Sequence, residues 1–317
     1  MSDVVTAILV YGAISSGMYA LLAVGFSMIY GVTEITNLAH GTLFMLGAYM
    51  YLLLVTPFGG FQIHYLLALI LSVIFVGILG SILYRFAMDP VVEDPVAIMV
   101  ITLSLAMIIQ EASGIVFGMG RILVPSIWVE FLKTLGMSDY LVILGVKTTY
   151  SQVLSALLSL GLFAALLIFI AKTKIGKAMK AMSQDREAAM LMGINIKRLT
   201  MLAMGIASTF AAVAGVLIIS STGGNVIYPH IWQTPLYIAF AIVILGGLGS
   251  IKGALVGAVI IGYVETIFVY WLDPILAKLI GGTPGGTLAS AVIMGFMLLV
   301  LLFRPKGLFG KYIELED

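Results

Sequence analysis

Two carboxylates, Glu111 and Glu265, lie within apolar runs long enough to cross a bilayer. A charged side chain is costly in the membrane interior, so such residues usually pair with another group or act in transport. In a transporter driven by an ion gradient, a carboxylate of this kind exchanges a proton or binds a cation. The alternative is structural: a hydrogen bond to a neighbouring helix, or contact with water near a helix end. The sequence leaves both possibilities open.

The sequence lacks the motifs that support catalysis, metal binding or nucleotide binding. It contains no Cys, and its three histidines, His40, His64 and His230, are far apart, so we expect no zinc site. It has neither a Gly-x-x-x-x-Gly-Lys-Ser/Thr phosphate loop nor a Gly-x-Ser-x-Gly elbow. We therefore expect no catalytic residue, metal or cofactor in this chain, and any energy from ATP must arrive through another subunit.

The composition indicates an integral membrane protein. Apolar residues make up 62% of the 317 residues and charged residues only 10%, whereas soluble domains carry roughly 25% charged residues. So few charges cannot cover the surface of a soluble protein of this length. The net charge of +1 gives no reason to expect a nucleic-acid partner. The partner implied by the composition is the lipid bilayer.

The apolar runs divide the chain into eight or nine membrane segments, since a spanning helix needs about 20 apolar residues. We expect nine helices, or eight if one of the first two or the short Pro235–Leu248 is re-entrant. The runs do not alternate as barrel strands do. The expected fold is an all-α polytopic membrane protein with one domain over residues 1–317. The other segments are one between Asp3 and Glu34, two between Glu34 and Arg85, and Val96–Gly118, Tyr150–Ala171, Leu199–Ser221, Ile251–Leu272 and Thr287–Phe303.

Basic residues predict the orientation, because loops rich in Lys and Arg face the cytoplasm. Residues 172–198 hold seven of the sixteen basic residues and form the predicted cytoplasmic loop. Three more follow the last segment, which places the C-terminus on the same side after an even number of crossings. The N-terminus and residues 119–149 are then outside, residues 85–95 are inside, and both carboxylates lie nearer the outer surface.

A short helix is predicted within the cytoplasmic loop. Ser183 is expected as its N-cap, with Asp185 and Glu187 in the first turn, where the positive end of the helix dipole favours anions. Gly193 suits the position just after the helix, and Asn195 follows it.

This predicted helix contains the apolar stretch Ala188–Met192, which is unusual for a solvated loop. One interpretation is an amphipathic helix lying on the membrane surface. The other is a coupling helix that inserts into a partner protein, for which Met side chains are suited. Glu187, Ala188, Ala189 and Gly193 match the Glu-Ala-Ala-x-x-x-Gly core of the cytoplasmic loop in ABC importer permeases. This match favours the coupling helix.

Further blocks resemble the branched-chain amino acid ABC permeases of the LivH type, in the family's order and over essentially the whole chain. The chain departs from that family at Asp89–Val92, where a basic Arg-Pro-x-Arg is common. The matching blocks are Tyr19-Ala20-Leu21, Gly25-Phe26, Tyr30-Gly31, Asn37–Gly41, Met45, Gly47-Ala48-Tyr49, Gly176–Met179, Gln184-Asp185, Gly193–Asn195, Leu245–Ser250, Gly253-Ala254, Gly257-Ala258, Glu265, Arg304-Pro305 and Gly307–Gly310.

The resemblance implies a permease subunit of an ATP-driven importer in the prokaryotic inner membrane, for branched-chain or other hydrophobic amino acids. It also implies a second homologous permease subunit, two cytoplasmic ABC ATPase subunits and an extracytoplasmic substrate-binding protein. Relatives also carry urea and short amides, and the sequence does not choose among these substrates. The alternative is an ion-gradient-driven secondary transporter or a channel for a small neutral solute, with Glu111 and Glu265 as its ion sites.

Polar residues between the first two predicted helices are candidates for the translocation pathway. Asn37, His40 and Gly41 form either an ordinary loop or a broken helix, whose exposed backbone groups transporters use for substrates. Glu265 joins these candidates because it recurs in the family pattern.

Three glycines follow a Gly-x-x-x-Gly-x-x-x-Gly pattern. Gly249, Gly253 and Gly257 are expected on one helical face, where small residues let two helices approach closely. We therefore expect them to act in helix packing.

Overall fold

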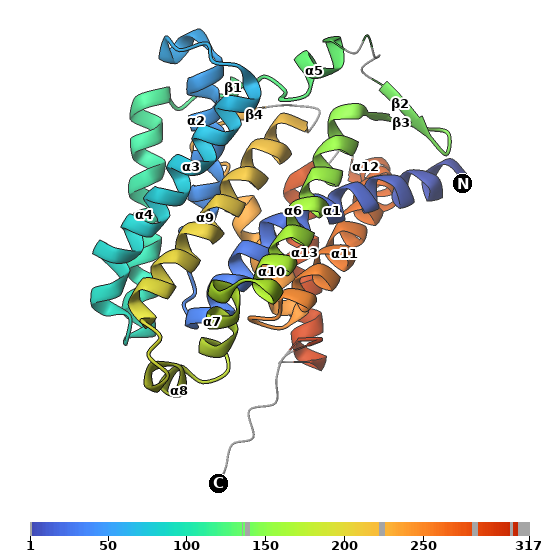
Figure 1. The fold of residues 1–317 in the computed structure, drawn as a ribbon. Helices are drawn as coiled ribbons and strands as arrows, with labels where there is room; N and C mark the ends of the chain where they lie inside the picture. Colours follow the sequence, from blue (N-terminus) through green and yellow to red (C-terminus); the bar gives the residue numbers. More distant parts are fainter. Residues whose placement is uncertain are drawn as a thin grey trace.

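The fold is a bundle of membrane-length helices with a few short β-strands at one end (Figure 1). The computed structural model describes residues 2–134, 136, 140–221, 226–280, 285–304 and 307–309. The α-helices are α1 (Ser2–Thr33), α2 (His40–Val55), α3 (Tyr65–Leu83), α4 (Pro95–Phe117), α5 (Val129–Thr134), α6 (Tyr150–Lys172), α7 (Lys174–Met182), α8 (Arg186–Leu191), α9 (Ile196–Ser221), α10 (Gln233–Gly246), α11 (Ile251–Ile267), α12 (Asp273–Ile280) and α13 (Gly285–Phe303).

Two of the long helices continue through π-helical turns. After α3 come η2 (Tyr84–Met88) and the 3₁₀ turn η3 (Asp89–Val91), and η4 (Phe268–Leu272) joins α11 to α12. A further 3₁₀ turn, η1 (Pro57–Gly59), follows α2. With these extensions, six helical stretches are long and apolar enough to span a bilayer, and three shorter apolar helices accompany them.

The prediction of an α-helical polytopic membrane protein is confirmed. In the described part of the chain, apolar helices occupy all nine predicted segments, but only six reach the length of a full span. The three short ones are α2, α10 and α13. One of these, α2, begins after a break in which Asn37 and Ala39 are buried inside the bundle.

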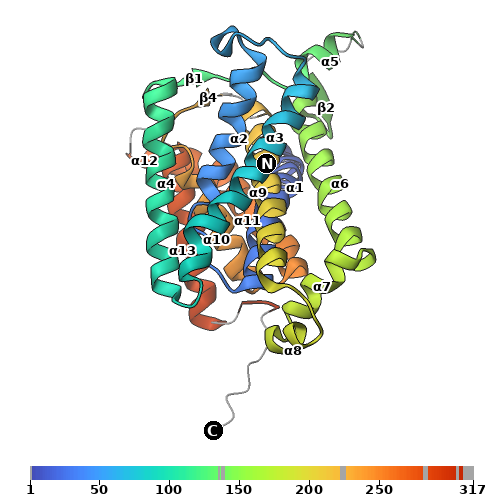
Figure 2. The same cartoon turned by 60° about the vertical axis from the view of Figure 1, so that its left-hand side comes forward.

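The centre of the bundle is formed by α1 and α9. In each of these helices 67% of the apolar window is buried within the protein, against 28–33% for the other four spans. Figure 2 shows α4 and α6 on opposite sides of the molecule with α1, α2, α3 and α9 between them. The outer helices therefore expose apolar side chains, which suits contact with lipid.

Close approach of the central helices depends on glycine. A Cβ built at Gly47 of α2 would lie 2.5 Å from the Cα of Ala212 on α9. No side chain larger than hydrogen fits there without a shift of the backbone. Gly47 therefore lets the backbones of α2 and α9 approach closely.

Short strands, which the all-α prediction missed, lie at the end of the bundle away from α8 (Figure 1). β1 (Ile122–Leu123) pairs with β4 (Val226–Ile227), and β2 (Tyr140–Ile143) forms a hairpin with β3 (Val146–Thr149). The hairpin turn has positive φ at Leu144 and Gly145, 51° and 82°, as a two-residue hairpin connection requires. Without an Asn-Gly or Gly-Gly pair, the sequence carries only a weak signal for this turn.

Candidate coupling and translocation sites

Helix α8 in the basic loop begins at a carboxylate cap. Asp185 has extended backbone angles, and its Oδ1 accepts a hydrogen bond of 2.9 Å from the N–H of Ala188. Ser183 was predicted as the N-cap, and this is wrong: it ends α7, and its hydroxyl donates to the carbonyl of Lys180 at 2.9 Å. The chain at Ser183 still follows the last turn of α7, because the carbonyl of Ala181 accepts from the N–H of Asp185 at 3.1 Å.

A glycine in the left-handed conformation ends α8. Gly193 has φ 82°, its N–H donates to Met190 at 2.9 Å, and the N–H of Ile194 donates to Ala189 at 3.1 Å. These two bonds form a Schellman motif. The next residue but one, Asn195, caps α9 by accepting a hydrogen bond of 3.0 Å from the N–H of Arg198. The corner between α8 and α9 is therefore held by hydrogen bonds on both sides.

The outer surface of α8 is apolar and exposed. Ala189 is buried against the bundle, whereas the side chains of Met190, Leu191 and Met192 are 53%, 89% and 83% exposed. Glu187 lies in the first turn and Ala188 beside it, both exposed. Helix α8 lies at the same end of the molecule as the C-terminal end of α13 (Figure 1). An exposed apolar tip of this kind on a well-capped helix suits insertion into another protein.

The break between α1 and α2 lies inside the helix bundle. Asn37 and His40 are both buried, and Nε2 of His40 lies 3.2 Å from the carbonyl oxygen of Leu22. Leu22 precedes the end of α1 at Thr33 by 11 residues, or about 16 Å at 1.5 Å per residue. After α1 ends, the chain thus turns back into the bundle before α2 begins.

Asn37 supports this turn with its side chain. Its Oδ1 accepts a hydrogen bond of 3.0 Å from the N–H of Ala39, and its Nδ2 lies 3.5 Å from Sδ of Met204 on α9. The first bond stabilises the non-helical backbone locally. The second links the break to the central helix α9.

A second helix N-terminus meets the first at Gly41. A Cβ at Gly41 would lie 2.5 Å from the carbonyl oxygen of Trp232, the residue that precedes α10. The indole of Trp232 donates to Oε1 of Gln110 at 2.7 Å, and Nε2 of Gln110 donates to Oε1 of Glu111 at 2.9 Å. Gln110 and Trp232 were not predicted as site residues; the signal for Gln110 was an amide next to Glu111 in an apolar run.

Glu265 lies apart from these residues. Its Oε2 accepts a hydrogen bond of 2.6 Å from the hydroxyl of Tyr19 on α1, and its side chain is half-buried. Tyr19 is one helical turn from Leu22, the partner of His40, so α1 contacts both candidate groups. Asn37, His40 and Gly41 thus lie together. Glu265 contacts α1 one turn away from the residue of α1 that His40 contacts.

The three glycines of the predicted packing face are divided between a turn and a helix. Gly249 has φ 77° and lies before α11, which begins at Ile251 with Ser250 as its N-cap. The prediction of one helical face is therefore wrong for Gly249, whose backbone lies against Gly31 at the end of α1. Gly253 and Gly257 lie on α11 and pack against the backbone of α10, where an added Cβ would collide with carbonyl oxygens.

A sequence profile of the branched-chain amino acid transport system permease component matches residues 8–302. The chain belongs to this family. This membership places it among transport permeases rather than enzymes, and it confirms the resemblance found from the loop and glycine blocks.

Two curated relatives come from Salmonella typhimurium (strain LT2). The permease protein LivH of a high-affinity branched-chain amino acid transport system is 29% identical over 310 residues, covering 95% of this chain and 94% of LivH. LivM, a permease protein of a system with the same description, is 25% identical over 308 residues, covering 92% of this chain and 67% of LivM. Among solved structures, PsaBC from Streptococcus pneumoniae in complex with Fab has a TM-score of 0.50, with 16% identity over 94% of this chain and 92% of that chain. This last similarity supports the fold alone.

Proposed function

We propose that this chain is one permease subunit of an ATP-driven importer of branched-chain or other hydrophobic amino acids. The observation that carries the proposal is α8: a helix capped at both ends, with an exposed apolar tip, in the main basic loop of a chain that belongs to this permease family. Energy from ATP hydrolysis on separate ATPase subunits enters the permease through this helix. Asp185, Glu187, Ala188, Ala189, Gly193 and Asn195 form the coupling site.

The proposed complex contains a second homologous permease subunit. Its support is that LivH and LivM, two permease proteins of one bacterium, both align with more than nine-tenths of this chain. The partner is either a second copy or a homologue. Two cytoplasmic ABC ATPases and an extracytoplasmic substrate-binding protein complete the assembly.

The proposed orientation places α8 and the C-terminus in the cytoplasm. The density of basic residues in 172–198 supports this, and so does the common position of α8 and the end of α13 at one end of the bundle (Figure 1). The β2–β3 hairpin then faces the extracytoplasmic side.

The proposed pathway includes the two helix N-termini that meet at Gly41. Helix N-termini carry partial positive charge, and inside a membrane they favour the carboxylate of an amino acid. Asn37 and His40 provide polar atoms beside this point, and Glu265 of α11 contacts α1 at Tyr19, one helical turn from the partner of His40. Movement of the surrounding helices is needed to open this region, since Asn37 and His40 are buried in the present conformation.

The direct test is reconstitution of the chain with its ATPases, partner permease and binding protein in proteoliposomes. Uptake of leucine should need ATP on the side of the membrane that carries the ATPases. It should also need the leucine-loaded binding protein on the opposite side. Uptake by this chain alone, driven by an imposed proton or sodium gradient without ATP, would overturn the proposal and support the secondary transporter.

A further inference from the structure

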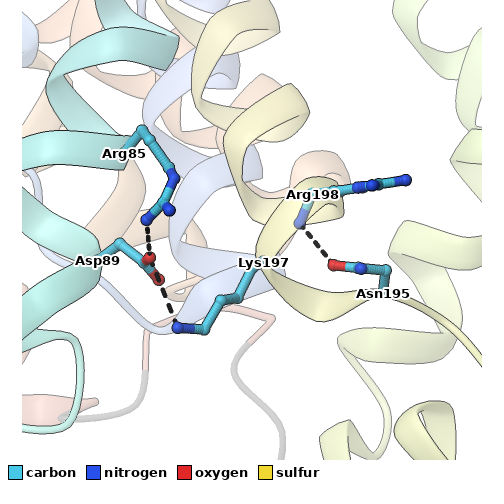
Figure 3. A network of polar contacts seen from close by, with 5 residues as sticks. All are labelled: Arg85, Asp89, Asn195, Lys197 and Arg198. Carbon is cyan, nitrogen blue, oxygen red and sulfur yellow. Dashed lines mark hydrogen bonds and ion pairs between the residues drawn. The ribbon is translucent and has the colours of Figure 1, made fainter.

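A buried carboxylate lies between α3 and α9 at the proposed cytoplasmic end of their interface. The side chain of Asp89, in η3, is 4% exposed, and its Oδ2 accepts from Nη1 of Arg85 at 2.8 Å and lies 3.6 Å from Nζ of Lys197 (Figure 3). Its other oxygen, Oδ1, is buried and has no hydrogen-bond partner among the described residues. Burial of a carboxylate is costly unless cations lie close. Arg85 and Lys197 therefore hold Asp89 in this position from two different helices.

The two helices that Asp89 connects are packed closely along their length. A Cβ at Gly80 of α3 would overlap Ser208 of α9, and the hydroxyl of Ser81 donates to the carbonyl of Met201 at 3.2 Å. Small residues at a helix interface let backbones touch, so relative sliding disturbs many contacts at once. The Asp89 contact lies at the end of this interface, just after the π-helical turn η2 that follows α3.

Lys197 lies just after the coupling corner. It is the second residue of α9, two positions beyond the capping residue Asn195. The hydrogen-bonded corner already ties α8 to α9, and Asp89 ties the start of α9 to the end of α3. A displacement of α8 therefore reaches α9 through the chain and α3 through Asp89.

We infer that Asp89 is a positioning residue that makes α3, α8 and α9 move as one unit during transport. The inference rests on the proposed function, in which α8 receives the force from an ATPase. It also gives a role to the segment where this chain departs from its family's common basic pattern. In this segment the acidic Asp89 pairs with the basic Lys197 at the start of α9.

Three variants and one control test the inference in the reconstituted complex. Asp89→Asn removes the charge and keeps the shape, Lys197→Gln removes the partner on α9, and the third variant combines both. Arg198→Gln is the control, because it removes a positive charge from the next residue, whose side chain points away from Asp89 (Figure 3). The measurement is the number of substrate molecules transported per ATP hydrolysed, which a loss of folded protein alone does not change.

We expect Lys197→Gln to lower this ratio by about two- to fivefold, because an ion pair with one exposed partner is weak. Asp89→Asn should lower it at least as much, and the double variant should be no worse than Asp89→Asn. The Arg198→Gln complex should resemble the wild type. Additive losses in the double variant, or an equal loss in Arg198→Gln, would overturn the inference.

A cross-link tests whether the ends of α3 and α9 stay together or separate during transport. The chain has no Cys, so Asp89→Cys/Lys197→Cys can be joined by a short bifunctional thiol reagent. If α3 and α9 move together, the cross-linked complex should transport at least as well per ATP as the unlinked double variant. Loss of transport on cross-linking would show that the two ends must separate, and the inference would be wrong. Failure of wild-type ATP-dependent transport would instead refute the proposed function.

Discussion

Replacement of Gly193 tests whether the end of α8 controls coupling. Its φ of 82° lies in the left-handed region, which costs about 1–2 kcal/mol for a residue with a Cβ. No atom lies within 4 Å of a Cβ built at this position, so Gly193→Ala adds backbone strain without a steric clash. At 1.4 kcal/mol per tenfold, this strain lowers the equilibrium ratio of intact to disrupted helix end by about five- to thirtyfold.

We expect Gly193→Ala to reduce the substrate-stimulated ATPase activity of the reconstituted complex, by at most about thirtyfold. Gly193→Pro should abolish the stimulation, because proline fixes φ near −65° and removes the N–H that bonds to Met190. Both variants should still insert and assemble, since Gly193 is exposed and outside the buried core.

The matched control is Gly60→Ala. Gly60 has φ 74°, and no atom lies within 4 Å of a Cβ built there. It lies in the turn between α2 and α3, and this turn is at the end of the bundle away from α8 (Figure 1). The Gly60→Ala variant therefore has similar backbone strain and leaves the coupling site unchanged. Wild-type stimulation in Gly193→Ala, or an equal loss in Gly60→Ala, would refute the reasoning.

Three further predictions address charge, topology and energy source. Glu187→Lys puts a cation in the first turn of α8, where the dipole favours an anion, so stimulated ATPase should fall while membrane insertion is unchanged; normal stimulation would contradict this. In intact cells, Ser183→Cys should react with impermeant thiol reagents only after access to the cytoplasm, and Lys147→Cys should react from outside; labelling of both from one side would contradict the orientation. Glu265→Gln keeps an oxygen that accepts from Tyr19, so ATP-driven uptake should change by only about twofold; complete loss would favour an ion-exchanging carboxylate.

The sequence predicted those features that depend on local pattern. Uninterrupted apolar runs marked every apolar helix of the described chain, because a bilayer allows few charges within a span. The end of α8 was also predicted, since only glycine accepts its left-handed backbone without strain. Its beginning was not, because Ser183 and Asp185 are both good caps and tertiary packing decides where α7 ends.

The depth of the break before α2 could not be predicted from the sequence. Asn37, His40 and Gly41 look like a loop between two spans, and nothing local shows that the chain turns back by several helical turns. This geometry depends on contacts between distant residues, such as His40 with Leu22 and Gly41 with Trp232. The same holds for Gly249, whose spacing fitted a helical face although its backbone forms a turn.

Helix α9 connects the two candidate sites physically. It begins at Ile196, directly after the corner that ends α8, and eight residues later Met204 contacts Asn37 in the break before α2. Eight residues of helix span about 12 Å, so the coupling corner and the buried polar break lie on one rigid element. A shift of α8 therefore reaches the break through the hydrogen-bonded corner of residues 192–195 and then along α9. Helix α9 is also packed against α2 through Gly47, so we expect the same shift to reach α2 and the break that precedes it.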